Sequence, residues 1–242
     1  MEKELFKLFD ENLVYENNIK RKERLEKLLR DTAKEIQVDS LLPDQIEEEW
    51  IINFSNAVKE TTNSYRLNIY RSMLINVINQ SITASISTIK FVKYVDIELL
   101  KKIHNNINYI FNIDNKKIFI NSGSNFGDPR YSFSLLDVST LIENKIITDI
   151  EKSITLDDMK IALTNSKYVY FLTGKSISIP IYIISDSLSQ VINIMQNTDN
   201  FQPLSHDELK QLFSRRNGVK VSLHLRIDNN RYKTAPLYEV TI

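Results

Sequence analysis

Apolar residues recur every three or four positions through the first 111 residues, with charged and polar residues between them. This spacing places the apolar side chains on one face of each helix. It predicts five helices, over residues 2–37, 44–61, 65–80, 87–94 and 96–110. Because the connections between them are short, we expect an antiparallel helical bundle that starts with a long N-terminal helix.

The second and third of these segments supply the expected core anchors. Trp50 and Phe54 lie four residues apart, and so do Tyr70 and Leu74. Asp44 and Glu47, three residues apart before the Trp50 helix, form a predicted capping box.

After Phe111 the period changes from about four residues to two, which is typical of strands. Strand-like runs occupy residues 115–121, 167–173, 176–185, 219–227 and 232–242. The Gly174-Lys175 and Asn229-Asn230 pairs predict a hairpin at 167–185 and another at 219–242. Helix signals lie at 132–145, after Thr155 (with Asp158), at 185–197, and from the Ser205–Glu208 capping box to Gly218. These patterns predict an α+β protein. We expect a helical bundle over 1–113, a linker over 114–130, and a mixed α/β, winged-helix-like domain over 131–242.

The linker contains "SGSNFGDPR", which could be a phosphate-binding loop or a boundary between folding units. A phosphate loop places glycines and usually a lysine before a helix. This stretch has no Gly-Lys-Ser/Thr motif, and Pro129 removes one N–H donor. We interpret this stretch as a hinge. Arg130 is its one positively charged residue and so its one candidate contact for an anion.

Net charge, cysteine content and the length of apolar runs disfavour several classes of function. Lys and Arg total 31, as do Asp and Glu, so no net field attracts nucleic acid or membrane. The absence of cysteine excludes disulfides and thiolate chemistry. The charged first residues are unlike a signal peptide, and no apolar run reaches the roughly 20 residues that a membrane span needs. We expect a cytoplasmic protein.

No catalytic, cofactor or metal constellation is visible. His104, His206 and His224 lack a ligand partner at metal-binding spacing. We expect the acidic groups Glu47–Glu49 and Asp157–Asp158 to lie in first helical turns, where the helix dipole favours negative charge. We therefore expect no enzyme activity.

Basic residues are the remaining candidates for interface or anion contacts. They are Arg21, Arg24, Arg130, Lys175, Arg215, Arg216 and Lys220. Glu23 and Glu26 dilute the charge near Arg21 and Arg24, which favours an ordinary solvated helix face.

The first half resembles a bacterial family of uncharacterised proteins related to the abortive-infection alpha group. The resemblance rests on "EEEWIINFSNAVKETTN", "YRSMLINVINQS" and "SISTIKFVKYVDIELLKKI". "YSFSLLDVSTLIENKII" is similar to the segment that opens a winged-helix-like unit in that family. The resemblance implies a role in phage defence and supplies no catalytic residues.

These observations favour a non-enzymatic interaction or sensor protein that acts through oligomer or partner contacts of its N-terminal helices. The alternative is a nucleic-acid-binding regulator that uses the second half as a winged-helix-like module.

Overall fold

The structure is a mixed α+β protein, described here from a computed structural model. It describes residues 2–36, 46–79, 84–120, 135–148, 152–158, 160–165, 167–198, 203–213, 217–228 and 231–242. Within these ranges lie ten α-helices and one antiparallel sheet of eight strands. The chain divides into two compact units, Met1–Ile97 with Ser187–Thr198, and Glu98–Asp186 with Asp199–Ile242.

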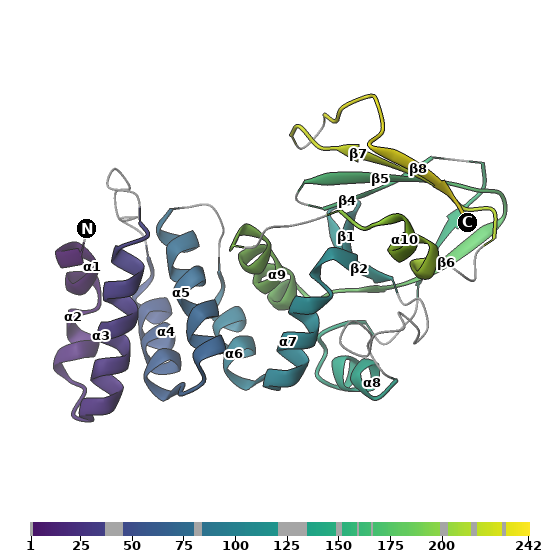
Figure 1. Ribbon diagram of the computed structural model, residues 1–242. Coiled ribbons are helices and arrows are strands. Elements are labelled where there is room, and N and C mark those ends of the chain that lie inside the picture. The colour runs from purple at the N-terminus through teal and green to yellow at the C-terminus, as the bar shows by residue number, and fades with distance from the viewer. Residues whose placement is uncertain are drawn as a thin grey trace. The chain divides into compact units, whose positions relative to one another are not determined.

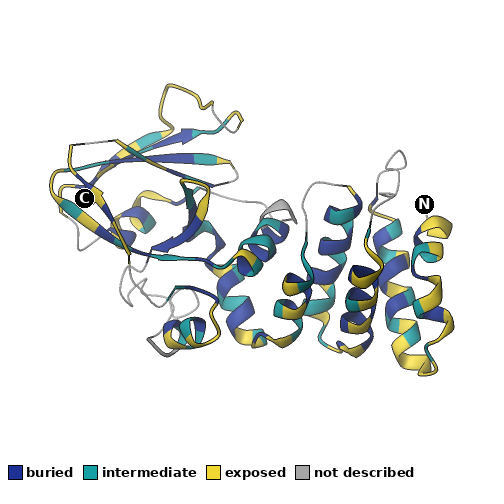
Figure 2. Ribbon diagram, turned by 180° about the vertical axis from the view of Figure 1, so that it is seen from behind, coloured by how far each residue is buried: buried dark blue, intermediate teal, exposed yellow. Residues whose placement is uncertain are grey.

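The helical unit consists of successive helices packed side by side (Figure 1). Its helices are α1 (Glu2–Leu8), α2 (Asp10–Val14), α3 (Ile19–Ala33), α4 (Glu48–Glu60), α5 (Ser64–Ile78), α6 (Ile86–Tyr94) and α9 (Asp186–Thr198). Helix α3 packs against α1, α4 and α5, and α4 also packs against α6. Buried residues line the sides that face neighbouring helices (Figure 2).

The core of this unit contains all four residues expected to anchor it. Trp50, Phe54, Tyr70 and Leu74 are at most 6% exposed. The Trp50 ring stacks on Phe54 at 4.9 Å between centroids, and the Tyr70 and Phe54 rings are nearly perpendicular with centroids 5.8 Å apart. The indole Nε1 of Trp50 donates a hydrogen bond of 2.7 Å to the Ala84 carbonyl, so its polar atom is satisfied as well.

The long N-terminal helix expected over 2–37 is wrong, because three helices occupy this segment. The chain leaves the helical conformation after Tyr15, and the Asn18 side chain then accepts a hydrogen bond from the Arg21 amide as the N-cap of α3. Asparagine competes for backbone donors in this way, so an apolar stripe can continue across a break.

Helix α4 also begins later than expected. Its N-cap residue is Glu47, which forms no side-chain cap bond. Asp44, the expected N-cap of a capping box with Glu47, lies outside the described residues. Helix α6 has a true cap in Ser85, which accepts from the Thr88 amide. The Gln190 side chain of α9 accepts from the Ser85 amide at 2.9 Å, which fixes α9 against the start of α6.

The second unit is built on the sheet. Its strands are β1 (Ile110–Ile113), β2 (Lys116–Ile120), β3 (Lys152–Leu156), β4 (Ile161–Thr164), β5 (Tyr168–Thr173), β6 (Ile177–Ile183), β7 (Lys220–Leu225) and β8 (Tyr238–Thr241). Its helices are α7 (Ile97–Asn105), α8 (Leu135–Glu143), α10 (His206–Leu212) and the short 3-10 helix Ile107–Tyr109. The strand order is β3-β6-β2-β1-β4-β5-β7-β8, with every neighbouring pair antiparallel.

Strands β1 and β2 form a tight hairpin that was not expected. Ile113 pairs with Lys116, so only Asp114 and Asn115 lie in the turn, and both have positive φ (47° and 62°). This geometry suits a two-residue hairpin of the kind that Asp and Asn tolerate. The helix expected over 96–110 is therefore too long, since α7 ends at Asn105 and Ile110 begins β1. The expected helical part, 1–113, consequently includes a strand of the sheet.

Two further predictions in the second half are wrong. Thr155 and Asp158 do not start a helix, because residues 152–156 and 161–164 are strands β3 and β4. Strands β5 and β6 do not form a hairpin: β5 pairs with β4 and β7, and β6 pairs with β2 and β3. Both edges of β5 and of β6 are thus filled by strands other than each other.

The link between β5 and β6 forces the sheet to curve. Three strands separate β5 from β6, so in a flat sheet they would lie about 19 Å apart at about 4.8 Å per interval. The chain from Thr173 to Ile177 can span only about 14 Å when fully extended. The sheet therefore bends around α10, which lies on its inner side (Figure 1).

The inner side of the curved sheet forms the core of this unit. Apolar residues from all eight strands pack there with Leu209, Leu212 and Phe213 at α10. The predicted capping box at Ser205 and Glu208 is confirmed: the serine hydroxyl accepts from the Glu208 amide, and the glutamate accepts from the Ser205 amide. Gly218 has a positive φ of 91° but lies beyond the end of α10, so it does not cap this helix as expected.

The terminal strands pair as expected, although β8 is shorter than the run that predicted it. Lys220 pairs with Thr241, and Leu223 pairs with Tyr238. The expected turn residues Asn229 and Asn230 lie outside the described part of the chain.

The core position of Trp50 makes a testable prediction. Replacing Trp50 with Ala removes a stacked ring and one buried hydrogen bond, so we expect the free energy of unfolding to fall by about 3–5 kcal/mol. Ile52 lies on the same helix and is 41% exposed; Ile52→Ala should cost less than about 1 kcal/mol. Urea denaturation followed by circular dichroism measures both. A Trp50→Ala loss as small as that of Ile52→Ala would contradict the packing described.

Candidate functional site

A row of polar side chains crosses the outer face of the sheet, opposite the apolar core. Asn112 of β1 pairs with Lys117 of β2 on one side and with Thr164 of β4 on the other. The row continues through Val169 of β5 to His224 of β7. Side chains alternate between faces along a strand, and the neighbours Phe111, Ile118, Leu163, Tyr170 and Leu223 belong to the inner core. The residues in the row therefore share the outer face.

Lys117 is the unusual member of this row. Its side chain is 7% exposed, and its ammonium donates a hydrogen bond of 3.1 Å to Asn112 Oδ1. Burial and then the nearby positive charge of Arg226 lower the pKa of Lys117 to about 8. No carboxylate among the described residues forms an ion pair with this lysine.

Asn112 and Arg226 complete the surroundings of the lysine. The Asn112 amide donates to the Thr164 carbonyl at 3.1 Å, while Arg226 Nη1 donates to the next carbonyl, that of Asn165, at 2.9 Å. Both donors therefore converge on the end of β4. The result is a cluster of nitrogen donors on the outer face, formed by Lys117, Asn112 and Arg226, which we call the cationic cluster.

Aromatic rings occupy the other end of the row. The Phe171 ring lies 5.1 Å from His224 and 4.8 Å from Tyr232 between centroids, and Lys160 Nζ lies 3.7 Å above its centre. Both ring nitrogens of His224 are engaged, Nδ1 with the Lys233 carbonyl at 2.9 Å and Nε2 with Ser222 Oγ at 3.2 Å. His224 is thus a packed, hydrogen-bonded residue rather than a free ligand.

Four tyrosines gather on the inner side of the sheet near the start of α10, where they hold the helix in place. The Tyr109 hydroxyl donates to Glu208 at 2.8 Å, and the Tyr170 hydroxyl accepts from the Leu204 amide at 3.1 Å. Burial, then Glu208 and Tyr168, raise the pKa of Tyr238 to about 12, and burial raises the pKa of Tyr170 too. The Tyr170 and Tyr238 hydroxyls therefore stay protonated near neutral pH and cannot act as bases.

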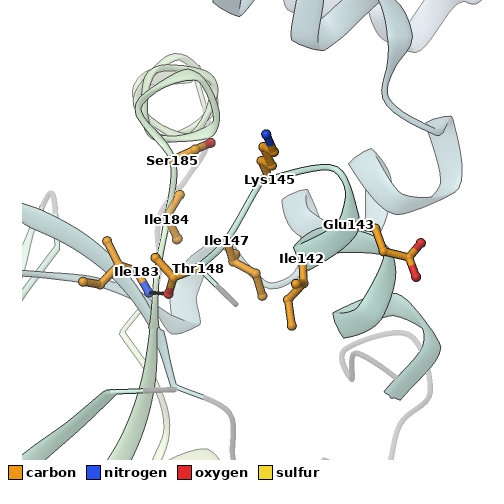
Figure 3. Close-up of a pocket in the computed structure, with 8 residues that line it drawn as sticks. All are labelled: Ile142, Glu143, Lys145, Ile147, Thr148, Ile183, Ile184 and Ser185. Carbon is orange, nitrogen blue, oxygen red and sulfur yellow. Dashed lines mark hydrogen bonds between the residues drawn. The ribbon is translucent and has the colours of Figure 1, made fainter. Parts of the chain in front are cut away.

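A separate hollow of about 440 Å³ lies beside the end of β6. Its lining residues are Ile142, Glu143, Lys145, Ile147, Thr148, Ile183, Ile184 and Ser185. The Thr148 hydroxyl accepts a hydrogen bond from the Ile183 amide, and the charged ends of Glu143 and Lys145 point away from the isoleucines (Figure 3). Because its charged groups do not converge, this hollow offers apolar surface rather than a reactive site.

The structure separates the basic residues that the sequence singled out. Arg21 is exposed on α3, whereas Arg24 is a structural residue that donates from Nη1 to the Thr61 carbonyl at 3.0 Å and so ties α3 to the end of α4. Lys175 and Lys220 are exposed at one end of the sheet, where Thr173 pairs with Lys220. Arg130, Arg215 and Arg216 lie outside the described residues.

Sequence reasoning missed the cationic cluster. A local signal existed in "IFNIDNKKIFI", where a two-residue Asp-Asn turn sets Asn112 opposite Lys117 and the strand period turns Lys116 and Lys117 to opposite faces. Arg226 had no such signal, because it follows β7, more than one hundred residues later in the chain. Within the described ranges, no group of three His, Asp or Glu residues could hold a metal ion, and no helix is long and apolar enough to cross a bilayer.

The buried lysine predicts a specific dependence of stability on pH. Below about pH 8 both folded and unfolded chains carry a charged Lys117, so the cost of burying that charge is fully present. Between about pH 8 and 10.5 the folded chain loses this proton first, so the free energy of unfolding rises with pH. Relative to Lys117→Met, the wild type should gain about 2–3 kcal/mol from about pH 7 to about pH 10.

Urea denaturation at several pH values measures this difference. Lys116→Met, which removes the exposed neighbour of Lys117, is the matched control and should show a constant difference from wild type. An equally constant difference for Lys117→Met would show that Lys117 titrates like an exposed lysine.

Comparison with known proteins identifies no family for this chain. No protein-family model matches the sequence, and neither curated proteins nor solved structures give a significant match.

Proposed function

We propose that the protein is a non-enzymatic interaction or sensor protein of the bacterial cytoplasm that takes part in antiviral defence of the abortive-infection type. The helical unit, an antiparallel bundle in this proposal, contacts another copy or a protein partner. The sheet unit holds a second component. The resemblance of the first half to proteins related to the abortive-infection alpha group supports the defence role.

The observation that carries the proposal is an exposed apolar surface between α2 and α3. Val14, Tyr15 and Ile19 are 62%, 79% and 71% exposed, although they fall within six residues of each other. Single exposed apolar residues are common, but a group of large ones marks an interaction site. Tyrosine is also enriched at protein interfaces, because it offers a large apolar ring with a polar tip.

The start of α3 adds charge beside this apolar group. Lys20, Arg21 and Lys27 are exposed on the helix that begins at Ile19. Basic residues around an apolar centre resemble the polar rim of an interface, and they favour a partner with acidic groups.

The apolar group predicts the effect of a double substitution. Tyr15→Ser with Ile19→Ser should weaken self-association or partner capture about tenfold or more, because truncating an aromatic interface anchor commonly costs more than about 1.4 kcal/mol. Sedimentation velocity over a concentration series measures self-association, and a quantitative pull-down from infected and uninfected bacteria measures capture. Tyr94, which is 73% exposed on α6, provides the control Tyr94→Ser. A monomeric wild type whose captured proteins match those of the double variant would refute the proposal.

A second candidate function is regulation through nucleic-acid binding by the region 131–242, the winged-helix-like module of this alternative. Lys160 above Phe171 and the exposed Tyr232 give the outer face a cation beside aromatic rings, a combination that binds single strands by charge and stacking. Helix α8 contributes Asp137 and Glu143 and no lysine or arginine, which disfavours it as a recognition helix.

This alternative predicts retention on heparin and on single-stranded DNA that weakens steeply with salt, because phosphate contacts release counterions. Lys160→Gln should lower the salt concentration of elution, whereas Lys210→Gln, on α10, should not. Passage of the wild type through both columns at low salt would exclude the alternative.

A further inference from the structure

The connection between β7 and β8 projects from the sheet on the side away from α10 (Figure 1). Every residue from 231 to 237 is exposed, and Figure 2 shows this stretch as a continuous exposed segment. Its apolar side chains Tyr232 and Leu237 are 37% and 53% exposed, and Ile227, just after β7, is 58% exposed. We call residues 226–228 and 231–237 the basic arm.

Hydrogen bonds fix the backbone of the basic arm, although its side chains face solvent. The Ile227 amide donates to the Arg231 carbonyl at 2.8 Å, which links the two sides of the arm. The Leu237 amide donates to the Leu223 carbonyl at 2.7 Å, and the Lys233 amide also donates to a carbonyl of β7, at 2.8 Å. A surface with a fixed backbone loses little conformational entropy when it binds a partner.

Positive charge predominates in the basic arm. Arg226, Arg231 and Lys233 lie in it together with one carboxylate, Asp228, which accepts two hydrogen bonds from Arg231. The Arg226 amide donates to the Lys167 carbonyl at 2.9 Å, so the exposed Lys167 lies beside the arm. The equal totals of basic and acidic residues in the whole chain therefore conceal a local excess of positive charge.

Two further charged residues lie close to the arm. Lys160 Nζ is 3.7 Å above the centre of the Phe171 ring, which packs against Tyr232 at 4.8 Å between centroids. Glu239, the carboxylate of β8, is exposed two residues beyond the end of the arm. Together with those of the arm, the named residues comprise five basic side chains and two carboxylates, of which Asp228 is already bonded to Arg231.

Exposed aliphatic side chains among basic ones fit an anionic lipid surface. Lysine and arginine are attracted to anionic headgroups, whereas isoleucine, leucine and tyrosine enter the boundary between headgroups and acyl chains. Nucleic acid would supply negative charge but would leave Ile227 and Leu237 in water. A stable protein interface needs about 800 Å² on each partner, which is more than one projecting segment of this length presents.

We propose that the basic arm attaches the sheet unit to membranes that contain anionic lipids. Ile227, Tyr232 and Leu237 insert at the level of the headgroups, and the surrounding lysines and arginines contact lipid phosphates. The attachment is peripheral and reversible, because only a few apolar side chains enter the lipid, and salt weakens it by screening the charges. It goes beyond the proposed function, because it does not use the apolar surface between α2 and α3.

Co-sedimentation of the full chain with lipid vesicles tests this proposal. We expect saturable binding to vesicles of equal parts phosphatidylserine and phosphatidylcholine, and binding at least about tenfold weaker to phosphatidylcholine alone. Ile227→Ser with Leu237→Ser should weaken binding at least about tenfold, because two inserted apolar groups are lost. Lys167→Gln with Lys233→Gln should also weaken it about tenfold or more, because each basic residue near the surface contributes a factor of about five.

Ile52→Ser with Lys116→Gln is the matched control, since it removes an exposed aliphatic and an exposed lysine elsewhere in the chain. This control should bind vesicles like wild type. The proposal is overturned if the chain does not bind the anionic vesicles, if it binds phosphatidylcholine alone equally well, or if both arm variants bind like wild type. Binding to single-stranded DNA that both arm variants weaken, without binding to vesicles, would overturn it in favour of nucleic acid.

Discussion

The short connection Gly174–Ser176 joins two strands that three other strands separate in the sheet. A connection of this length cannot cross a flat sheet, so β5 and β6 can coexist only if the sheet bends until their ends meet. A side chain at position 174 would crowd this meeting point, since an added Cβ would lie 2.7 Å from Ile177 Cδ1. The bend gives the sheet an inner side deep enough to enclose α10, and most apolar residues of this unit turn toward that side.

The same bend also affects which side chains lie on the outer face of the sheet. On the outer face, Lys117, Asn112 and Thr164 lie side by side on β2, β1 and β4, and Val169 of β5 separates them from His224 of β7. Hydrogen bonds from Asn112 and Arg226 to the end of β4 hold this row, and Lys117 is buried against it with one acceptor. A buried cation costs stability unless a counter-charge is supplied.

Local chemistry explains what the sequence predicted well. The Ser205–Glu208 box and the pairing of β7 with β8 depend on residues that are close in sequence, and both are present. Predictions that needed distant partners failed. Gly174-Lys175 resembles a hairpin turn, but β2, β3, β4 and β7 occupy the strand edges that such a hairpin would use. The prediction of one long first helix is wrong for a local reason: at one of its two breaks Asn18 caps the start of a new helix, α3, although the apolar spacing continues across the break.

The ionisation of Lys117 tests most directly whether the curved sheet buries a cation without a carboxylate partner. In a sample labelled with 13C-lysine, the Lys117 ε-carbon signal can be assigned by its absence from the Lys117→Met spectrum and followed from about pH 6 to about pH 11. We expect a midpoint at about pH 8. A midpoint near the ordinary lysine value of about 10.4 would contradict it, because the side chain would then be solvated or paired with an acid.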